Sequence, residues 1–318
     1  MQITKNIIKY SILTGLFLVP FIPFIVPSAM FFPFITGKGF AFRIITEIIF
    51  GLFVILAFWE KEYRPKLSWI TKAVLVFTGI VLVADLAGVN VSKSLWSNYE
   101  RMEGFVLIAH LAMYYIVASS VFNTKQKWFR FFDVSIASSL IMSIYALMQL
   151  AGKETINQGG VRVDGTFGNA TYYAIYIVFH IFICIYFAID STKPKWQRWA
   201  YLSIGVLNAF ILYFTATRGA ILGLIGGLIL SGLMIIFLDK ENTQLKKVSY
   251  YVIGFVALII VGFIPFKDTE YVKTSQVLSR FSTLGIAEIK TQGRYFVWPM
   301  AIKGFKEHPV LGWGQENV

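Results

Sequence analysis

Residues 215–238 have the sequence TATRG followed by AILGLIGGLILSGLMIIFL, and this stretch decides the fold class. The part from Ala220 to Leu238 contains no charged residue. As a helix, it is long enough to cross the ~30 Å hydrocarbon core of a membrane. Arg218 stands directly before this apolar run. The segment therefore predicts a membrane-spanning helix with an arginine at its head.

Similar apolar segments occur along the rest of the chain. Their approximate limits are residues 10–26, 42–59, 68–87, 104–122, 131–151, 171–189, 199–214 and 248–266. Of the 318 residues, 57% are hydrophobic and only 14% are charged, which excludes an ordinary soluble protein and a disordered chain. We therefore predict an all-α fold, a polytopic transmembrane helix bundle of about nine spans.

The basic residues predict how the bundle is oriented. Lys and Arg are more frequent in the N-terminal segment and in every second connection after it than in the other short connections. Because short cytoplasmic loops carry an excess of basic residues, we place the N-terminus inside. The net charge of +12 then reflects topology and, in part, a basic outer segment, and we expect no nucleic-acid partner.

This orientation divides the chain into two predicted domains. Residues 1–266 form the transmembrane bundle, and residues 267–318 begin a large, partly helical loop outside the membrane. The loop ends at residues 312–318, GWGQENV, which form neither a polar tail nor the end of a hydrophobic element. We therefore expect the loop to be incomplete and the chain to be part of a longer protein.

Arg218 is the first candidate for chemistry, because a basic residue on the outer side runs against the usual distribution of charge. A guanidinium group can bind two phosphate oxygens at once, and the start of a helix adds free backbone N–H groups. Arg294 is the second candidate. It begins a predicted amphipathic helix that reaches Phe305 and could rest on a membrane surface through Phe296 and the apolar residues that follow it.

Arg101 and Arg162 are weaker candidates for binding a substrate. Each lies in an outer connection where aromatic and polar residues alternate, a pattern that suits a sugar site and equally an aromatic belt at the membrane surface. For Arg218 the alternative is an arginine that only anchors the helix, and for Arg294 it is a solvated charge.

Cysteine and histidine chemistry has little support. The single cysteine, Cys184, excludes an internal disulfide and a Cys-based metal site. His110 and His180 stand alone on membrane helices, where we expect structural hydrogen bonds. His308 has no base or nucleophile near it in the sequence. We therefore expect no metal site and no cofactor.

Four stretches carry a resemblance to a known family. They are NYERMEG at 98–104, TFGNATYYA at 166–174, TRGAIL at 217–222 and GRYFVWPMAIKGFKEHPVLGWG at 293–314. In this order they resemble the O-antigen ligase and O-antigen polymerase family, which are membrane glycosyltransferases. The last stretch is the most specific, with a Gly-Arg pair, a Trp four residues later and then His-Pro-x-x-Gly-x-Gly.

The resemblance implies a function in lipopolysaccharide or other polysaccharide biosynthesis of the cell envelope. A glycan would pass, without a metal, from an undecaprenyl-pyrophosphate carrier to a hydroxyl of a glycan, lipid A core or protein acceptor. Arg218 and Arg294 would hold the pyrophosphate. The protein would lie among the lipids of the cytoplasmic (inner) membrane, with its active face periplasmic or extracellular.

Two further expectations accompany the resemblance. The functional histidine of the family lies beyond the Gly-x-Gly stretch, so we expect the fragment to be inactive alone. The alternative function is a transporter or flippase of lipid-linked polysaccharide, a class that usually has repeated halves and charges deep within its spans.

Overall fold

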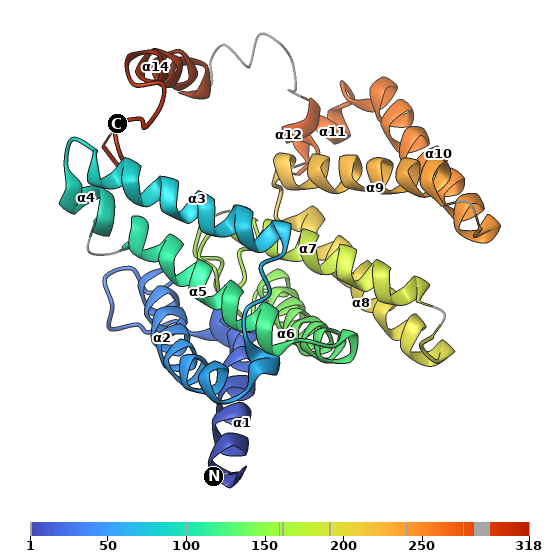
Figure 1. The fold of residues 1–318 in the computed structure, drawn as a ribbon. Helices are drawn as coiled ribbons and strands as arrows, with labels where there is room; N and C mark the ends of the chain where they lie inside the picture. Colours follow the sequence, from blue (N-terminus) through green and yellow to red (C-terminus); the bar gives the residue numbers. More distant parts are fainter. Residues whose placement is uncertain are drawn as a thin grey trace. The chain divides into compact units, whose positions relative to one another are not determined.

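The structure is a computed structural model that describes residues 2–98, 101–158, 160, 162–190, 192–239, 241–275, 277–282 and 293–317. The regular elements in these ranges are all helical, so the predicted all-α fold is confirmed (Figure 1). In chain order they are α1 (Gln2–Leu18), η1 (Val19–Phe24), α2 (Thr36–Trp59), η2 (Lys61–Tyr63), α3 (Trp69–Leu86), α4 (Val91–Trp96), α5 (Phe105–Val121), α6 (Lys125–Leu150), α7 (Ala170–Ile189), α8 (Lys195–Phe214), α9 (Arg218–Leu238), α10 (Thr243–Phe266), α11 (Glu270–Thr274), α12 (Ser279–Ser282) and α14 (Gly293–Glu307).

Each predicted apolar segment corresponds to one of these helices. In the described ranges, seven helices are long and apolar enough to cross a membrane: Gln2–Phe24, which joins α1 and η1, and then α2, α3, α6, α7, α9 and α10. The shorter α5 has 17 residues, and α8 begins with charged residues that lower its hydropathy. A polytopic helical membrane protein is therefore confirmed, and the predicted number of nine spans is approximate.

Several helices begin where a polar side chain caps them. Asn169 accepts a hydrogen bond from the backbone N–H of Thr171 at the start of α7, and Asn242 accepts one from Leu245 at the start of α10. Such caps satisfy N–H groups that have no partner within the helix. The sequence thus fixes these helix starts locally.

The chain forms two compact units. Unit 1 contains residues Met1–Ser138 and Gln292–Val318, and unit 2 contains Ser139–Thr291. This division follows packing, whereas the predicted boundary at residue 266 follows membrane topology and stays a prediction.

Unit 1 is built on α1, α2 and α5. Helix α2 packs against both α1 and α5, and the core between them includes Ile12, Leu16, Ile49 and Val117. Gly15 on α1 faces the Ile49 side chain so closely that a Cβ atom would not fit. A small residue there lets the two helix backbones approach each other, as is common between membrane helices.

Unit 2 contains two helix pairs. Helices α7 and α8 pack along each other, and α9 packs against α10 (Figure 1). Asn208 on α8 is fully buried and hydrogen-bonds to the hydroxyl groups of Ser139 and Ser143 on α6. These bonds satisfy a polar side chain that would be costly to bury alone. The ends of α6 and α8 and the starts of α7 and α9 carry the candidate site.

Candidate functional site

The candidate site lies at the turn between α8 and α9. Thr215 and Ala216 form the turn, Thr217 is the N-cap residue, and Arg218 is the first residue of α9. Ala216 has a φ of +48°, an unusual backbone conformation for a residue other than glycine. The space beside Gly219 is open. The first N–H groups of α9 therefore directly follow a tight turn.

Two arginines bind this turn from outside it. Arg162 Nε donates to the Thr215 carbonyl at 3.2 Å, and its terminal Nη2 donates to the Thr217 hydroxyl at 3.3 Å. Arg280 Nη1, from α12, donates to the Ala216 carbonyl at 2.9 Å. Three separate segments of unit 2 therefore place arginines at one short turn.

Arg162 and Arg280 bring two positive charges to this turn. Among the residues that the structure describes, no carboxylate forms an ion pair with Arg162 or Arg280. Burial and, after it, the positive charge of Arg280 lower the pKa of Arg162 below its ordinary value. Arg162 stays protonated at neutral pH, because a guanidinium group loses its proton only in strongly alkaline solution. Two positive charges at one turn favour the binding of an anion there.

A buried carboxylate holds the loop that carries Arg162. Asp164 is fully buried and accepts hydrogen bonds from Gln149 Nε2 at 2.8 Å and from the Gln158 backbone N–H at 2.9 Å. The amide oxygen of Gln149 in turn accepts from the Gly165 N–H. Val163 N–H donates to the Phe214 carbonyl, which ties the loop directly to the end of α8. This network fixes the position from which Arg162 reaches the turn.

Two of the four predicted site residues lie at this turn. Arg218 and Arg162 come together at one turn, although they were predicted separately and with different weight. Sequence reasoning did not select Arg280, which was counted only as one basic residue of the outer segment. No short motif surrounds it. Its relevance depends on a contact with Ala216, 64 positions earlier in the chain.

The other two predicted residues belong to unit 1. The side chain of Arg101 is about half exposed and lies 4.0 Å from the Glu103 carboxylate, a geometry typical of a weak surface pair. Arg294 is in the first turn of α14, and its side chain lies outside the part that the structure describes. Their roles in substrate binding stay predictions.

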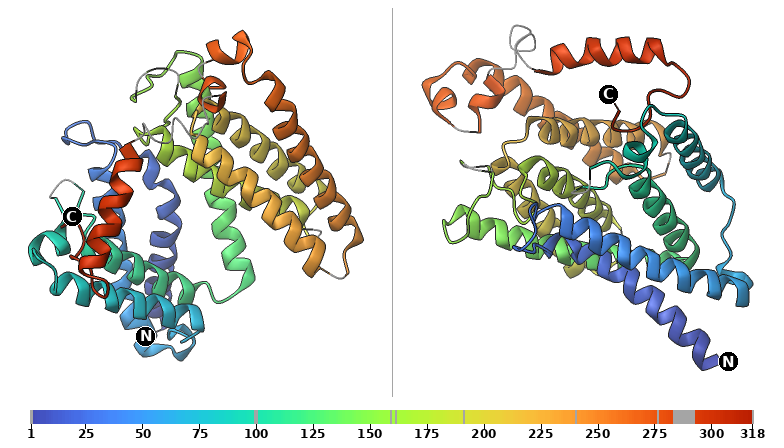
Figure 2. Two further views of the ribbon diagram at one scale, coloured as in Figure 1. Left: turned by 90° about the horizontal axis from the view of Figure 1, so that it is seen from above. Right: turned by 90° about the vertical axis from the view of Figure 1, so that its left-hand side faces the viewer.

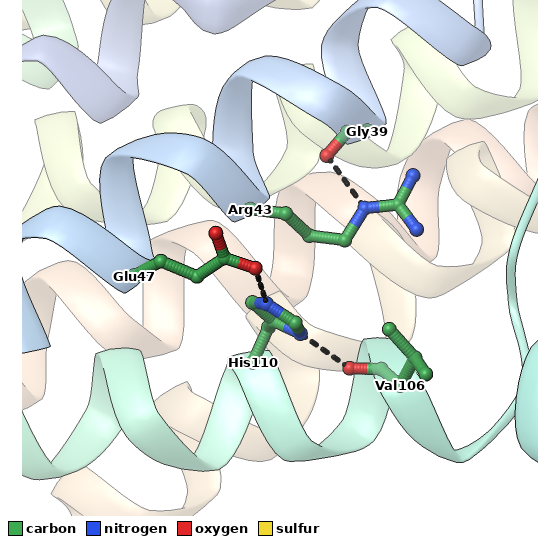
Figure 3. A network of polar contacts seen from close by, with 5 residues as sticks. All are labelled: Gly39, Arg43, Glu47, Val106 and His110. Carbon is green, nitrogen blue, oxygen red and sulfur yellow. Dashed lines mark hydrogen bonds and ion pairs between the residues drawn. The ribbon is translucent and has the colours of Figure 1, made fainter.

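A second polar cluster connects α2 and α5 within unit 1 (Figure 3). His110 Nε2 lies 3.0 Å from the Glu47 carboxylate, and its Nδ1 lies 2.6 Å from the Val106 carbonyl. One turn away on α2, Arg43 Nε donates to the Gly39 carbonyl at 3.1 Å. The structural hydrogen bonds expected for His110 are confirmed, and those for His180 also, through the Tyr176 carbonyl.

The Gly-x-Gly stretch packs against the end of α3. Val89 N–H donates to the Trp313 carbonyl at 3.1 Å, and Gln315 N–H donates to the buried Asp85 carboxylate at 2.8 Å. Asn317 donates to the hydroxyl of Ser94 on α4 at 2.7 Å. Residues more than 220 positions apart in the sequence thus pack together in unit 1.

Metal ligands do not gather in the described part of the chain, where no three His, Cys, Asp or Glu side chains form a potential metal site.

The fold and the site define a class: a polytopic helical membrane protein with arginines gathered at helix ends. Comparison with known protein families finds a similarity over the C-terminal third of the chain. Residues 203–318 match the family model described as O-antigen ligase, and this match includes Arg218, Arg280 and Arg294. The predicted resemblance to this family is thereby confirmed, and the family indicates a membrane glycan ligase or polymerase. No curated protein and no solved structure matches the chain.

Proposed function

We propose that the protein transfers a glycan from an undecaprenyl-pyrophosphate carrier to an acceptor hydroxyl at the outer face of the cytoplasmic membrane. Arg162, Arg218 and Arg280 bind the pyrophosphate of the donor. The observation that carries this proposal is the binding of Arg162 and Arg280 to the turn that Arg218 follows. The family match over residues 203–318 supports the reaction class.

The chemistry of the cluster suits a diphosphate ester. Guanidinium groups bind phosphate oxygens through paired N–H groups, and several of them around one turn match the several oxygens of a pyrophosphate. The N–H groups at the start of α9 add a further favourable field for an anion. The backbone contacts of Arg162 and Arg280 hold these donors before the substrate arrives, which preorganises the site.

In the proposed reaction, the bond between the anomeric carbon and the phosphate oxygen breaks. A bond from that carbon to the acceptor oxygen forms on the opposite side, with inversion. The acceptor hydroxyl releases its proton to the solvent, and the pyrophosphate leaves with one additional negative charge. The arginines stabilise this charge most strongly at the transition state, where it is developing.

Substitution of Arg218 and Arg280 by alanine tests the proposal. We expect each change to lower the transfer rate by about 100-fold, the usual effect of removing one donor that stabilises developing charge. Arg198 offers a matched control, because its Nε donates to the Ala188 carbonyl at 2.8 Å at the opposite ends of α7 and α8. Arg198→Ala should leave transfer unchanged, and all variants should insert equally.

The assay must follow glycosidic bond formation and lipid translocation separately. Full transfer activity in Arg218→Ala and Arg280→Ala would remove the cluster from the mechanism. Translocation of the lipid-linked glycan without bond formation in the wild-type protein would refute the transferase proposal and establish the transporter alternative.

A further inference from the structure

Helix α14 presents large apolar side chains that the described protein does not cover. Trp298 is 70% exposed, Phe305 is 65% exposed and Ile302 is 54% exposed. In the right-hand view of Figure 2, α14 runs along the edge of unit 1 without another helix of the unit beside it. A helix of this composition needs an apolar surface to bury its side chains.

Five apolar residues of α14 share one face, whereas Phe296 and Met300 lie on the other side. At helical spacing, Val297, Trp298, Ala301, Ile302 and Phe305 share a side. Lys303 and Glu307 lie on the opposite side, and Lys306, one turn after Ile302, lies at the edge of the apolar face. Phe296, which the sequence analysis placed in the apolar set, is seven positions before Lys303 and therefore shares the charged side.

Two hydrogen bonds of Trp313 fix where α14 is attached. Trp313 Nε1 donates to the Gly304 carbonyl at 3.1 Å, in the second half of the helix. The Trp313 carbonyl accepts from the N–H of Val89, three residues beyond the end of α3 at Leu86. Because α3 is long and apolar enough to span a membrane, its end marks the membrane boundary. Helix α14 is therefore held at that boundary.

We propose that α14 lies in the plane of the membrane interface and binds a lipid surface that contains anionic phospholipids. Its apolar face enters the boundary between headgroups and acyl chains, and Lys303 and Lys306 stay at the level of the headgroups. A basic polar face opposite an apolar face is the arrangement by which such helices bind membranes. The attachment through Trp313 holds the helix at the depth of the lipid headgroups.

This placement also bears on the substrate, a consequence that rests on the proposed function. Arg294 belongs to the first turn of α14, so an interfacial helix brings this residue to the depth of headgroup phosphates. The pyrophosphate of a polyprenyl-linked donor lies at the same depth, because its chain is in the membrane and its glycan is in water.

Single cysteines on adjacent positions test the proposal. Ile302→Cys places a nitroxide spin label on the apolar face, and Lys303→Cys places one on the charged face. The protein is reconstituted in vesicles of phosphatidylethanolamine and phosphatidylglycerol, and the collision rates of each label with oxygen and with a water-soluble nickel chelate are measured. Cys184 is fully buried, so the unsubstituted chain is the labelling blank.

We expect the ratio of oxygen to nickel collisions to be several-fold higher at residue 302 than at 303. Phe305→Cys should behave like residue 302, and Glu307→Cys like residue 303. Equal access of nickel to all four labels would refute the proposal. The proposal would also be overturned if neither oxygen nor nickel reached the labels at 302 and 305, because protein would then cover this face. The measurement needs no transfer activity, so its failure is separate from failure of the proposed function.

Discussion

The buried carboxylate of Asp164 allows a quantitative prediction about unit 2. Asp164→Ala removes the acceptor of two hydrogen bonds, from Gln149 Nε2 and from the Gln158 N–H. A hydrogen bond to a charged group contributes about 1.5–3 kcal/mol, so losing both costs about 3–6 kcal/mol. Part of this is offset, because the variant no longer buries a carboxylate. We expect the free energy of opening unit 2 to fall by about 3 kcal/mol. This corresponds to about a 100-fold larger population of molecules in which the unit is open.

The chain contains its own reporter for this change. Cys184 is the single cysteine, and it is fully buried on α7 in the same unit. A maleimide reaches it only when the unit opens, so its labelling rate follows the open population. In Asp164→Ala, labelling of Cys184 in lipid nanodiscs should be about 100-fold faster than in the unsubstituted protein, for the ~3 kcal/mol loss expected above.

Asp239 provides a matched control. Its carboxylate also accepts two hydrogen bonds, from the backbone N–H groups of Glu241 and Asn242, but these bonds are exposed to solvent. Backbone donation, first from Asn242 and then from Glu241, lowers the pKa of Asp239. Exposed donors released by Asp239→Ala bind water, so Cys184 labelling should change little. Equal labelling rates in Asp164→Ala and Asp239→Ala would refute the argument that burial makes Asp164 important.

Two further predictions concern the Gly-x-Gly stretch and metal dependence. In Gly88→Ala, the new Cβ would lie 2.8 Å from the Trp313 carbonyl oxygen and 3.0 Å from Gly314 Cα, whereas Gly79→Ala meets open space. Overpacking of this kind costs about 1–3 kcal/mol, so the Gln315 amide should exchange hydrogen about 10- to 100-fold faster in Gly88→Ala alone; unchanged exchange would contradict the close packing. Chelation of divalent cations should leave glycan transfer at its full rate, and a loss of transfer that Mg²⁺ restores would refute a metal-independent reaction.

The sequence was sufficient for the class of fold and for the position of its helices. Apolar run length and local charge are properties of neighbouring residues, and a membrane helix satisfies its backbone hydrogen bonds within itself. The run after Arg218 therefore predicted α9 and the residue at its head without any knowledge of packing. The span count was less certain, because α5 is short and α8 carries charges near its start.

The candidate site was predictable only in part. Arg218 was selected because an arginine at the outer end of an apolar run is unusual. This signal does not depend on how the helix packs in the fold. Arg162 received less weight, since its sequence surroundings equally suit an aromatic belt. Arg280 was missed, because a contact with a carbonyl far along the chain leaves no local pattern.

The sequence alone thus determined that this is a membrane protein of helices, with basic residues at their ends and motifs that resemble those of the O-antigen ligase family. Only the tertiary structure decided which of these residues meet. Gln315 and Asp85 are 230 positions apart, yet they share a hydrogen bond, and Arg162 reaches Thr215 across 53 positions. Helix formation depends on interactions within a few residues, whereas a site depends on distances between segments that only packing sets.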